Sequence, residues 1–364
     1  MRFPEFNGEW HSTNIGECCS PLEYGMNASA KEYDGKNKYI RITDIDEETC
    51  TYKYDDVVSP NALLEDKYKV LDNDILFART GASTGKAYLY DKKDGLMYYA
   101  GFLIRGNVKP DFNSKYVFLQ TQTQKYKKWV EVMSIRSGQP GINSQEYSCF
   151  KFNLPPTKAE QDKISSLFTL LDERITTQIR IIDKLQSLMK GLAEHLTSFT
   201  PNTKIADCLN CHSSVLQENQ IKSEGKYKVY GANGICGYSD SPAILEDAIL
   251  IVKDGSGVGN VSYASGEYSV IGTSNYLTAK SGYSLTYLYY CLMIFNFVSY
   301  RTGMAIPHIY FNDYGKALIY CPPLDKQIQI ATLLSKIECK IEAETIITDS
   351  YQQQKRFLLQ SMFI

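Results

Sequence analysis

A long amphipathic segment that follows two prolines constrains the fold of this chain more than any other feature. Pro155 and Pro156 cannot lie in the interior of a helix, so they end the segment before them and allow a helix to begin near Lys158. From there to Leu196 the apolar residues fall on two neighbouring heptad lines, which is typical of a coiled-coil seam. The residues that we expect to face a second helix are Phe168, Leu171, Ile175, Ile182, Leu185, Met189 and Leu192. Such a helix is on the order of 58 Å long, at ~1.5 Å per residue, which is too long for the core of one small domain.

Gln178 is the polar exception on these heptad lines. It either fixes the register of a helix pair or leaves the contact to its neighbour Ile179. We expect the second arrangement.

The same pattern returns at the end of the chain, from Cys321 to Ile364, and forms an internal repeat. Two prolines again precede a long amphipathic segment, in which Gln327 corresponds to Gln161 and Ile330 to Ile164. The residues that we expect to pair in this second helix are Leu334, Ile337, Ile341 and Leu358. Its centre is more polar, because Glu344, Thr348 and Lys355 fall on the heptad lines. A repeat at this distance indicates two copies of a larger unit.

Length and charge set further bounds. A chain of 364 residues should hold two or more domains, and no apolar run approaches the ~18 residues of a membrane span. The start of the chain lacks the apolar region of a signal peptide, so we expect a cytoplasmic protein whose ten cysteines are reduced thiols. A net charge of −2 excludes a generic basic nucleic-acid binder.

The globular segments before the two helices also repeat each other. Ala248 to Gly259 corresponds to Asp74 to Gly85, and both segments end in a glycine-rich loop. We expect strands over 38–43, two strands within 67–78, a helix over 114–132 and a final strand over 148–154. The sequence therefore predicts an α+β fold: two mixed α/β domains at 1–153 and 198–321, and two long helices at 154–197 and 322–364 that pair as an antiparallel coiled coil with a pseudo-two-fold internal repeat.

Several sequence motifs resemble catalytic or metal-binding motifs but are incomplete or lack the required context. The loop from Gly81 to Lys86 is one residue shorter than a phosphate-binding loop, and Ala87 stands where a Mg²⁺-binding hydroxyl would be required. Cys208-Leu-Asn-Cys211-His212 matches a haem attachment motif, but no export signal accompanies it. There is no amino-methylation motif and no nuclease signature. We therefore expect a non-catalytic chain with no metal site and no cofactor of its own.

The order of domains and helices, the start RFPEFNGEW, and the loops DILFARTG and GSGVG together resemble the specificity subunit of type I restriction-modification systems. The resemblance covers the whole chain, and the two Pro-Pro helical blocks are its most specific part. It implies that each domain is a target recognition domain that reads one half of a bipartite site in double-stranded DNA. It also implies that the helices set the gap and dock two modification (methyltransferase) subunits, which join restriction/translocase subunits. S-adenosylmethionine, ATP and Mg²⁺ would be used in those partner subunits.

Candidate DNA contacts lie in the glycine-rich loops and in the later loop of each domain. Base reading needs Arg, Lys, Asn or Gln on exposed loops, and phosphate contacts use Lys, Arg, Ser, Thr and backbone amides. The candidates are Arg79, Thr80, Ser83, Lys86, Arg136, Gln139, Asn143, Lys253, Ser256, Asn260, Arg301, His308 and Tyr310. The alternative is that the glycine-rich loops are only tight turns and that the arginines anchor loops by hydrogen bonds.

A second class of function stays open at this point, namely a helical scaffold with two protein-binding domains. Near-neutral charge favours it. The divergence between the two domains opposes it, because the framing strands and helices match while the intervening segments differ.

Overall fold

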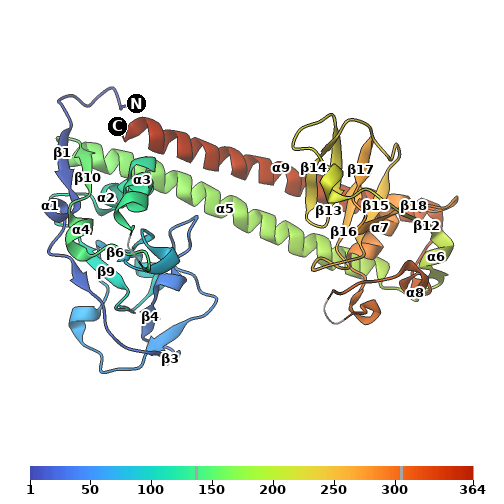
Figure 1. Cartoon of the computed structure of the whole chain (residues 1–364), viewed down its shortest axis with the longest axis horizontal. Coiled ribbons are helices and arrows are strands. Elements are labelled where there is room, and N and C mark those ends of the chain that lie inside the picture. Colours follow the sequence, from blue (N-terminus) through green and yellow to red (C-terminus); the bar gives the residue numbers. More distant parts are fainter. Residues whose placement is uncertain (136–137, 304–305, 364) are drawn as a thin grey trace. The chain divides into compact units, whose positions relative to one another are not determined.

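The computed structural model describes residues 1–135, 138–303 and 306–363. The chain forms two compact units, Met1–Thr177 with Thr348–Ile364, and Gln178–Ile347. Each unit contains one globular domain and a part of each of two long helices, α5 (Lys158–Thr197) and α9 (Leu324–Met362) (Figure 1). The predicted α+β class, with two mixed domains and two long helices, is confirmed.

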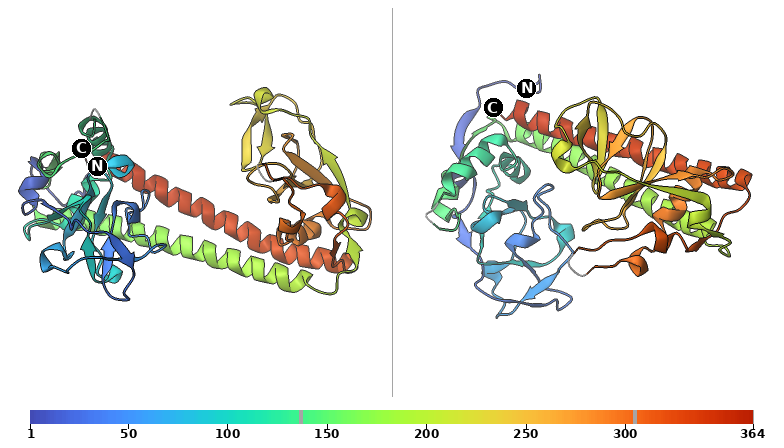
Figure 2. Two further views of the ribbon diagram at one scale, coloured as in Figure 1. Left: turned by 60° about the horizontal axis from the view of Figure 1, so that its bottom comes forward. Right: turned by 45° about the vertical axis from the view of Figure 1, so that its right-hand side comes forward.

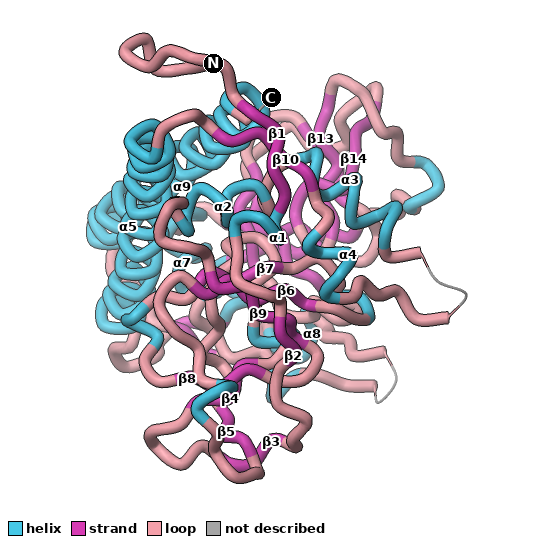
Figure 3. Tube along the Cα trace, turned by 90° about the vertical axis from the view of Figure 1, so that its left-hand side faces the viewer, coloured by secondary structure: helices cyan, strands magenta, loops and turns pink. Residues whose placement is uncertain are grey.

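The first domain is built around a four-stranded sheet with the order β2-β9-β6-β7. Its central strand β6 is buried along its whole length. Ile75 and Phe77 point into a core shared with the helices, whereas Leu76 and Ala78 point into a second core on the opposite face. Figure 3 shows the short helices gathered around this sheet. The elements are β1 (His11–Asn14), α1 (Ile15–Cys18), β2 (Glu23–Tyr24), β3 (Ala30–Glu32), β4 (Lys38–Ile40), β5 (Val58–Pro60), β6 (Asp74–Ala78), β7 (Ala87–Leu89), β8 (Met97–Tyr99), β9 (Leu103–Asn107), α2 (Ser114–Gln120), α3 (Gln124–Met133), α4 (Ser144–Ser148) and β10 (Lys151–Leu154).

The second domain repeats this arrangement around the sheet β12-β18-β15-β16 and adds a three-stranded sheet, β14-β13-β17. The central strand β15 is again buried, with Ile249 and Ile251 in one core and Ala248 and Leu250 in another. Burial on both faces explains why β6 and β15 are apolar at nearly every position. The elements are β11 (Thr203–Lys204), α6 (Ile205–Cys208), β12 (Leu209–Ser213), β13 (Tyr227–Gly231), β14 (Gly234–Ser239), β15 (Ala248–Val252), β16 (Val261–Ala264), β17 (Tyr268–Val270), β18 (Ser274–Ala279), α7 (Leu285–Met293), α8 (Phe311–Tyr314) and β19 (Leu318–Ile319).

Each domain has its first and last strands hydrogen-bonded to each other. β1 pairs antiparallel with β10, so that His11 lies opposite Leu154. β11 pairs with β19 in the same way, with Thr203 opposite Ile319. The chain therefore leaves each domain beside the point at which it entered.

In the first unit, the beginning of α5 packs against the end of α9. Phe168 and Leu171 of α5 share a core with Leu358 of α9. Farther along, Asp172 accepts a 2.8 Å hydrogen bond from Lys115 of α2 and forms an ion pair of 2.7 Å with Lys355 of α9. These residue numbers rise along α5 while they fall along α9, so the two helices run antiparallel in this unit.

In the second unit, the end of α5 packs against the beginning of α9, again antiparallel (Figure 2). Ala193 of α5 and Leu334 of α9 are fully buried in one core. Among the residues that were expected to pair, Phe168, Leu171, Leu334 and Leu358 are buried. The others, Ile175, Ile182, Leu185, Met189, Leu192, Ile337 and Ile341, are half-buried.

The expectation for Gln178 is wrong. Its side chain is half-buried and donates a 2.6 Å hydrogen bond to Glu344 of α9, whereas Ile179 is 38% exposed. Glu344 and Thr348 lie on the heptad lines of α9 and are buried although they are polar. The pairing face of the helices thus has a polar centre, which offsets the loss of apolar contact with hydrogen bonds.

Three secondary-structure expectations also need correction. The helix expected over 114–132 is divided into α2 and α3, because the hydroxyls of Thr121 and Thr123 bond to backbone carbonyls and Thr123 caps α3. Within 67–78 β6 is the one strand, and Asp66–Tyr68 forms a 3₁₀ turn instead. The strand expected over 38–43 ends at Ile40, and a further 3₁₀ turn follows at Ile42–Asp44.

Candidate nucleic-acid interface

The glycine-rich loop of the first domain is a tight turn between β6 and β7. Gly81 and Gly85 both have positive φ angles, 69° and 92°, which other residues rarely adopt. The Gly85 amide donates a 3.0 Å hydrogen bond to the carbonyl of Ala78, closing the turn. A Cβ atom on Gly85 would lie 2.5 Å from Val130 of α3, so this position also requires glycine for space.

A second loop supports this turn. The Gly81 amide donates a 2.9 Å hydrogen bond to the backbone carbonyl of Pro140. The Ile142 amide donates a 2.9 Å hydrogen bond to the backbone carbonyl of Arg79. Beneath them, the hydroxyl of Tyr147 donates a 2.6 Å hydrogen bond to the Ala78 carbonyl. Burial raises the pKa of Tyr147, so its hydroxyl stays protonated and available as a donor.

The second domain repeats the backbone hydrogen bonds of this two-loop arrangement. The Gly255 amide donates a 3.0 Å hydrogen bond to the Pro307 carbonyl, and the Gly259 amide donates a 2.9 Å hydrogen bond to the Val252 carbonyl. The Ile309 amide donates to Lys253 at 2.9 Å. Gly255 and Gly259 also have positive φ angles, 96° and 89°. The repeat predicted from the glycine pairs is therefore a repeat of backbone hydrogen bonds.

In the first domain the candidate DNA contacts have different surroundings. Arg79 is half-buried and lies 4.7 Å above the ring of Tyr24, and the half-buried Lys86 forms a 3.2 Å ion pair with Glu47. Thr80 and Ser83 are half-buried within the turn, and Gln139 is exposed beside Gly81. Asn143 is exposed, but its side chain caps α4 by accepting from the Glu146 amide at 2.9 Å. Arg136 lies outside the described residues.

The candidates of the second domain are mostly accessible. Ser256 and Asn260 are exposed, and Lys253 is half-buried. Arg301 is exposed, but its guanidinium donates to the Val258 carbonyl at 2.7 Å and so anchors the glycine-rich loop. His308 is half-buried, and its ring packs edge-on against exposed Tyr310 at 4.9 Å. The anchoring alternative therefore describes Arg301, and DNA contact by the other residues stays a prediction.

The sequence did not single out a group of lysines on α3 as candidate DNA contacts. Lys125, Lys127 and Lys128 are exposed on α3, whose opposite face buries Tyr126 in the core. Among the described residues none of these lysines has an ion pair or a hydrogen bond from its side chain. The net charge of a whole segment does not reveal them, because acidic residues elsewhere in the segment balance them. The net charge along this one helix would have identified them.

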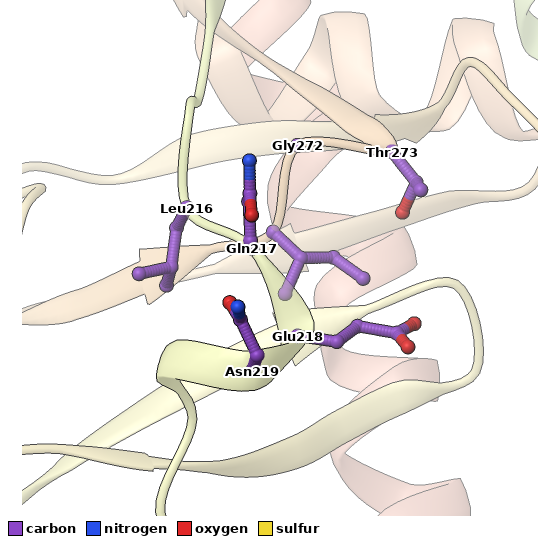
Figure 4. Close-up of a pocket in the computed structure, with 7 residues that line it drawn as sticks. Leu216, Gln217, Glu218, Asn219, Gly272 and Thr273 are labelled. Atoms are coloured by element: carbon purple, nitrogen blue, oxygen red, sulfur yellow. The ribbon is translucent and has the colours of Figure 1, made fainter.

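Two hollows lie on the second domain. One, of about 400 Å³, is lined by Leu216, Gln217, Glu218, Asn219, Ile271, Gly272 and Thr273 (Figure 4). The Gln217 amide donates to the side chain of Gln220, which ties this loop to its own turn. Glu218 also lines this hollow, and its carboxylate disfavours an anionic ligand.

The other hollow, of about 550 Å³, adjoins the glycine-rich loop. It is formed by the turn between β13 and β14, by the start of β16 and by the end of α7. Its polar side chains are Asn233, Asn260 and Ser262, and all three are exposed. Of these, Asn260 is a candidate from the sequence, while Asn233 and Ser262 had no distinguishing motif.

Within residues 1–135, 138–303 and 306–363, no group of His, Cys, Asp and Glu side chains is placed to hold a metal ion. Over the same residues, no helix combines the length and the apolarity that crossing a bilayer requires.

The family model for the type I restriction modification DNA specificity domain matches residues 7–187 and 204–349. The chain is similar to the type I restriction enzyme EcoprrI specificity subunit of Escherichia coli, with 24% identity over 112 residues. That match spans 31% of this chain and 28% of the relative, so it covers less than a third of the relative's length.

Solved structures share the fold. The crystal structure of the type I restriction-modification system S subunit from M. genitalium covers 100% of this chain and 98% of its own, at 16% identity and a TM-score of 0.69. A structure titled for complex assembly and conformational transition of the type I R-M system covers 96% of both chains, at 15% identity and a TM-score of 0.56. Two copies of one recognition fold, joined by long helices, define a protein with duplicated binding domains. With the model matching both copies, the chain belongs to the type I restriction-modification DNA specificity family.

Proposed function

We propose that this chain is the DNA-recognition subunit of a type I restriction-modification complex. The observation that carries the proposal is the family match to both halves of the chain. The repeated two-loop arrangement supports it, because each copy keeps the same backbone hydrogen bonds while presenting different side chains. A shared framework with divergent surfaces is what two readers of unlike half-sites require.

In this proposal residues 1–153 and 198–321 each read one half of a bipartite site in double-stranded DNA. The helices, at 154–197 and 322–364, set the unread gap and dock two methyltransferase subunits, which act with restriction/translocase subunits. The chain itself is not catalytic. S-adenosylmethionine, ATP and Mg²⁺ serve the partner subunits, and the complex works in the cytoplasm. The helical adaptor with protein-binding domains is not favoured, because the family match is to DNA specificity domains.

The candidate DNA contacts fall into two groups, according to whether their side chains are hydrogen-bonded to the rest of the protein. Gln139, Lys253, Ser256, Asn260 and Tyr310 have side chains without strong internal bonds and are the better candidates for base or phosphate contact. Residues such as Asn143 and Arg301 serve first to hold their loops.

The test is an exchange of one domain. Methylated-base sequencing of DNA from cells that carry this gene and its partner genes should reveal a split motif with a fixed gap. Replacing residues 1–153 with those of another family member should change one half of the motif and leave the other half and the gap intact. A change in both halves together, or the absence of a split motif, would contradict the proposal.

A further inference from the structure

The hollow beside the glycine-rich loop of the second domain has polar side chains without partners inside the chain. Among the described residues, the side chains of Asn233, Asn260 and Ser262 form no hydrogen bond with the protein. The Asn260 side chain lies close to Gly257, since its Nδ2 atom is 3.2 Å from the point where a Cβ atom of Gly257 would be. The amide therefore lies over a glycine that leaves room for it.

The wall of the hollow is built by close approach of two turns. The same Cβ position on Gly257 lies 3.6 Å from the Cβ of Ala232 in the turn between β13 and β14. Gly234 completes that turn with a φ of 99°. The glycine-rich loop and the β13–β14 turn thus pack against each other and bring Asn233 and Asn260 to one opening.

The first domain carries different side chains at the equivalent place. By strand register, Ser262 lies opposite Leu250 as Tyr88 lies opposite Leu76. Tyr88 is buried and donates its hydroxyl to Asp94, and Lys86, which corresponds to Asn260, is paired with Glu47. The two domains therefore differ in chemistry at a shared position, as readers of unlike sequences would.

The lining restricts what can bind. Among the described residues, no Lys, Arg, Asp or Glu borders the hollow, so it offers no positive charge to neutralise a phosphate and no carboxylate, the usual partner of the cytosine amino group. Lysine and arginine are the usual partners of guanine, whereas an Asn amide bonds in bidentate fashion to N6 and N7 of adenine. A hydroxyl such as that of Ser262 can donate or accept beside it.

We propose that Asn260, together with Asn233 and Ser262, reads the edge of one adenine in the half-site that the second domain binds. The inference rests on the proposed function and deepens it, since it assigns a base and its readers to one of the two domains.

The test uses the complete complex with its methyltransferase subunits and duplexes that carry its methylated motif. The domain exchange described above identifies the half-site of the second domain. Replacing the adenine in question with 7-deazaadenine removes the N7 acceptor and should weaken binding by wild type by roughly 10-fold or more. Asn260→Ala should bind both duplexes about equally weakly, because the reader of N7 is then gone.

Asn260→Asp gives a sharper readout. It keeps the size of the side chain but replaces a donor with an acceptor, so preference at one position should move from adenine towards cytosine. Asn219→Ala is the matched control, since Asn219 borders the other hollow of the same domain. Ser262→Ala gives a second variant with a mild change in volume, which should relax the same position.

The outcomes separate the two claims. A split motif in wild type that stays unchanged in all the variants overturns the adenine reader and leaves the proposed function standing. A change confined to the half-site of the first domain also overturns it. Absence of a split motif in wild type contradicts the proposed function itself.

Discussion

Gln178 of α5 and Glu344 of α9 meet side chain to side chain, with the amide Nε2 donating a 2.6 Å hydrogen bond to the carboxylate. Glu344 is also paired with Lys340 on its own helix, and these hydrogen bonds, that of Lys340 first, lower the pKa of Glu344 below its ordinary value. The contact requires one register of the helices, because an amide must lie opposite a carboxylate.

Changing Gln178→Glu should therefore make stability depend on pH in a defined direction. Two carboxylates would face each other, which raises the pKa of one of them above its unfolded value. The variant should be destabilised at pH 7 and recover as the pH falls below about 5, where that carboxyl binds a proton. Thermal unfolding at several pH values measures this. Gln186→Glu, at an exposed site on α5, is the control, and identical pH profiles for the two variants would contradict the contact.

Ile182→Asp should loosen the helix pair, whereas Ile179→Asp should have little effect. Ile182 is half-buried on the pairing face, and Ile179 is 38% exposed beside it. Loss of packing together with desolvation of a carboxylate costs roughly 2–4 kcal/mol at a buried site. Circular dichroism melts and co-purification with methyltransferase subunits provide the readouts. Equal behaviour of the two variants would show that the heptad assignment is wrong.

Gly85→Ala should destabilise the first domain by roughly 1–3 kcal/mol, because it combines a positive φ with a steric clash. The added methyl group would meet Val130, so the double variant with Val130→Ala should recover part of the loss and retain the backbone strain. Gly138→Ala is the control, since among the described residues no heavy atom lies within 4 Å of a Cβ added at that position. Urea unfolding of each variant measures the differences. A neutral Gly85→Ala would show that the turn is not fixed by these constraints.

Asp172→Asn should weaken the contact between α2 and the helix pair. Burial alone would raise the pKa of Asp172, but the ammonium groups of Lys115 and Lys355 outweigh it and lower the pKa. A lowered pKa contributes stability that is present above the unfolded value, about 3.9, and is lost as the pH falls through the folded value. The variant should lose roughly 1–2 kcal/mol at pH 7 and show a shallower decline in acid. Thermal unfolding against pH is the measurement, and an unchanged acid slope would count against this ion pair.

The lysines of α3 should carry part of the salt-dependent DNA affinity. At a net charge of −2 the isolated chain should bind DNA poorly at ~150 mM salt, with partner subunits supplying the missing positive charge. In the complex, changing Lys125, Lys127 and Lys128 to Gln should reduce the slope of log K against log salt by up to about 3, at about 0.9 per phosphate contact. Changing the exposed Lys31, Lys36 and Lys53 to Gln is the control. Equal slopes for the two triple variants would exclude α3 from the interface.

The sequence was sufficient for the helices and the repeat because both rest on periodic positions. The heptad lines hold even where they carry Glu344 and Thr348, so the period predicts position better than polarity does. The prediction that Ile179, and not Gln178, faces the second helix was wrong, because the hydrogen-bond partner of Gln178 is Glu344 on that other helix. Nothing local distinguishes a polar residue that will find such a partner.

The candidate interface was less predictable for the same reason. Arg301 is held by the Val258 carbonyl, and Lys86 by Glu47, and both partners are distant in sequence. Asn143 was recognisable, because Asn143 and Glu146 have the spacing of a capping box. Asn233 and Ser262 acquire significance only when two turns bring them to one hollow, which no spacing along the chain reveals.

The pairing of β1 with β10 and of β11 with β19 has an evolutionary consequence. Since each domain begins and ends at neighbouring points, it is inserted as a self-contained unit between the long helices. The gene segment that encodes one domain could be exchanged by recombination within the flanking helix sequences, and the helices would still pair in the same register. New specificities would then arise by shuffling existing segments, without the slow accumulation of substitutions at individual contacts.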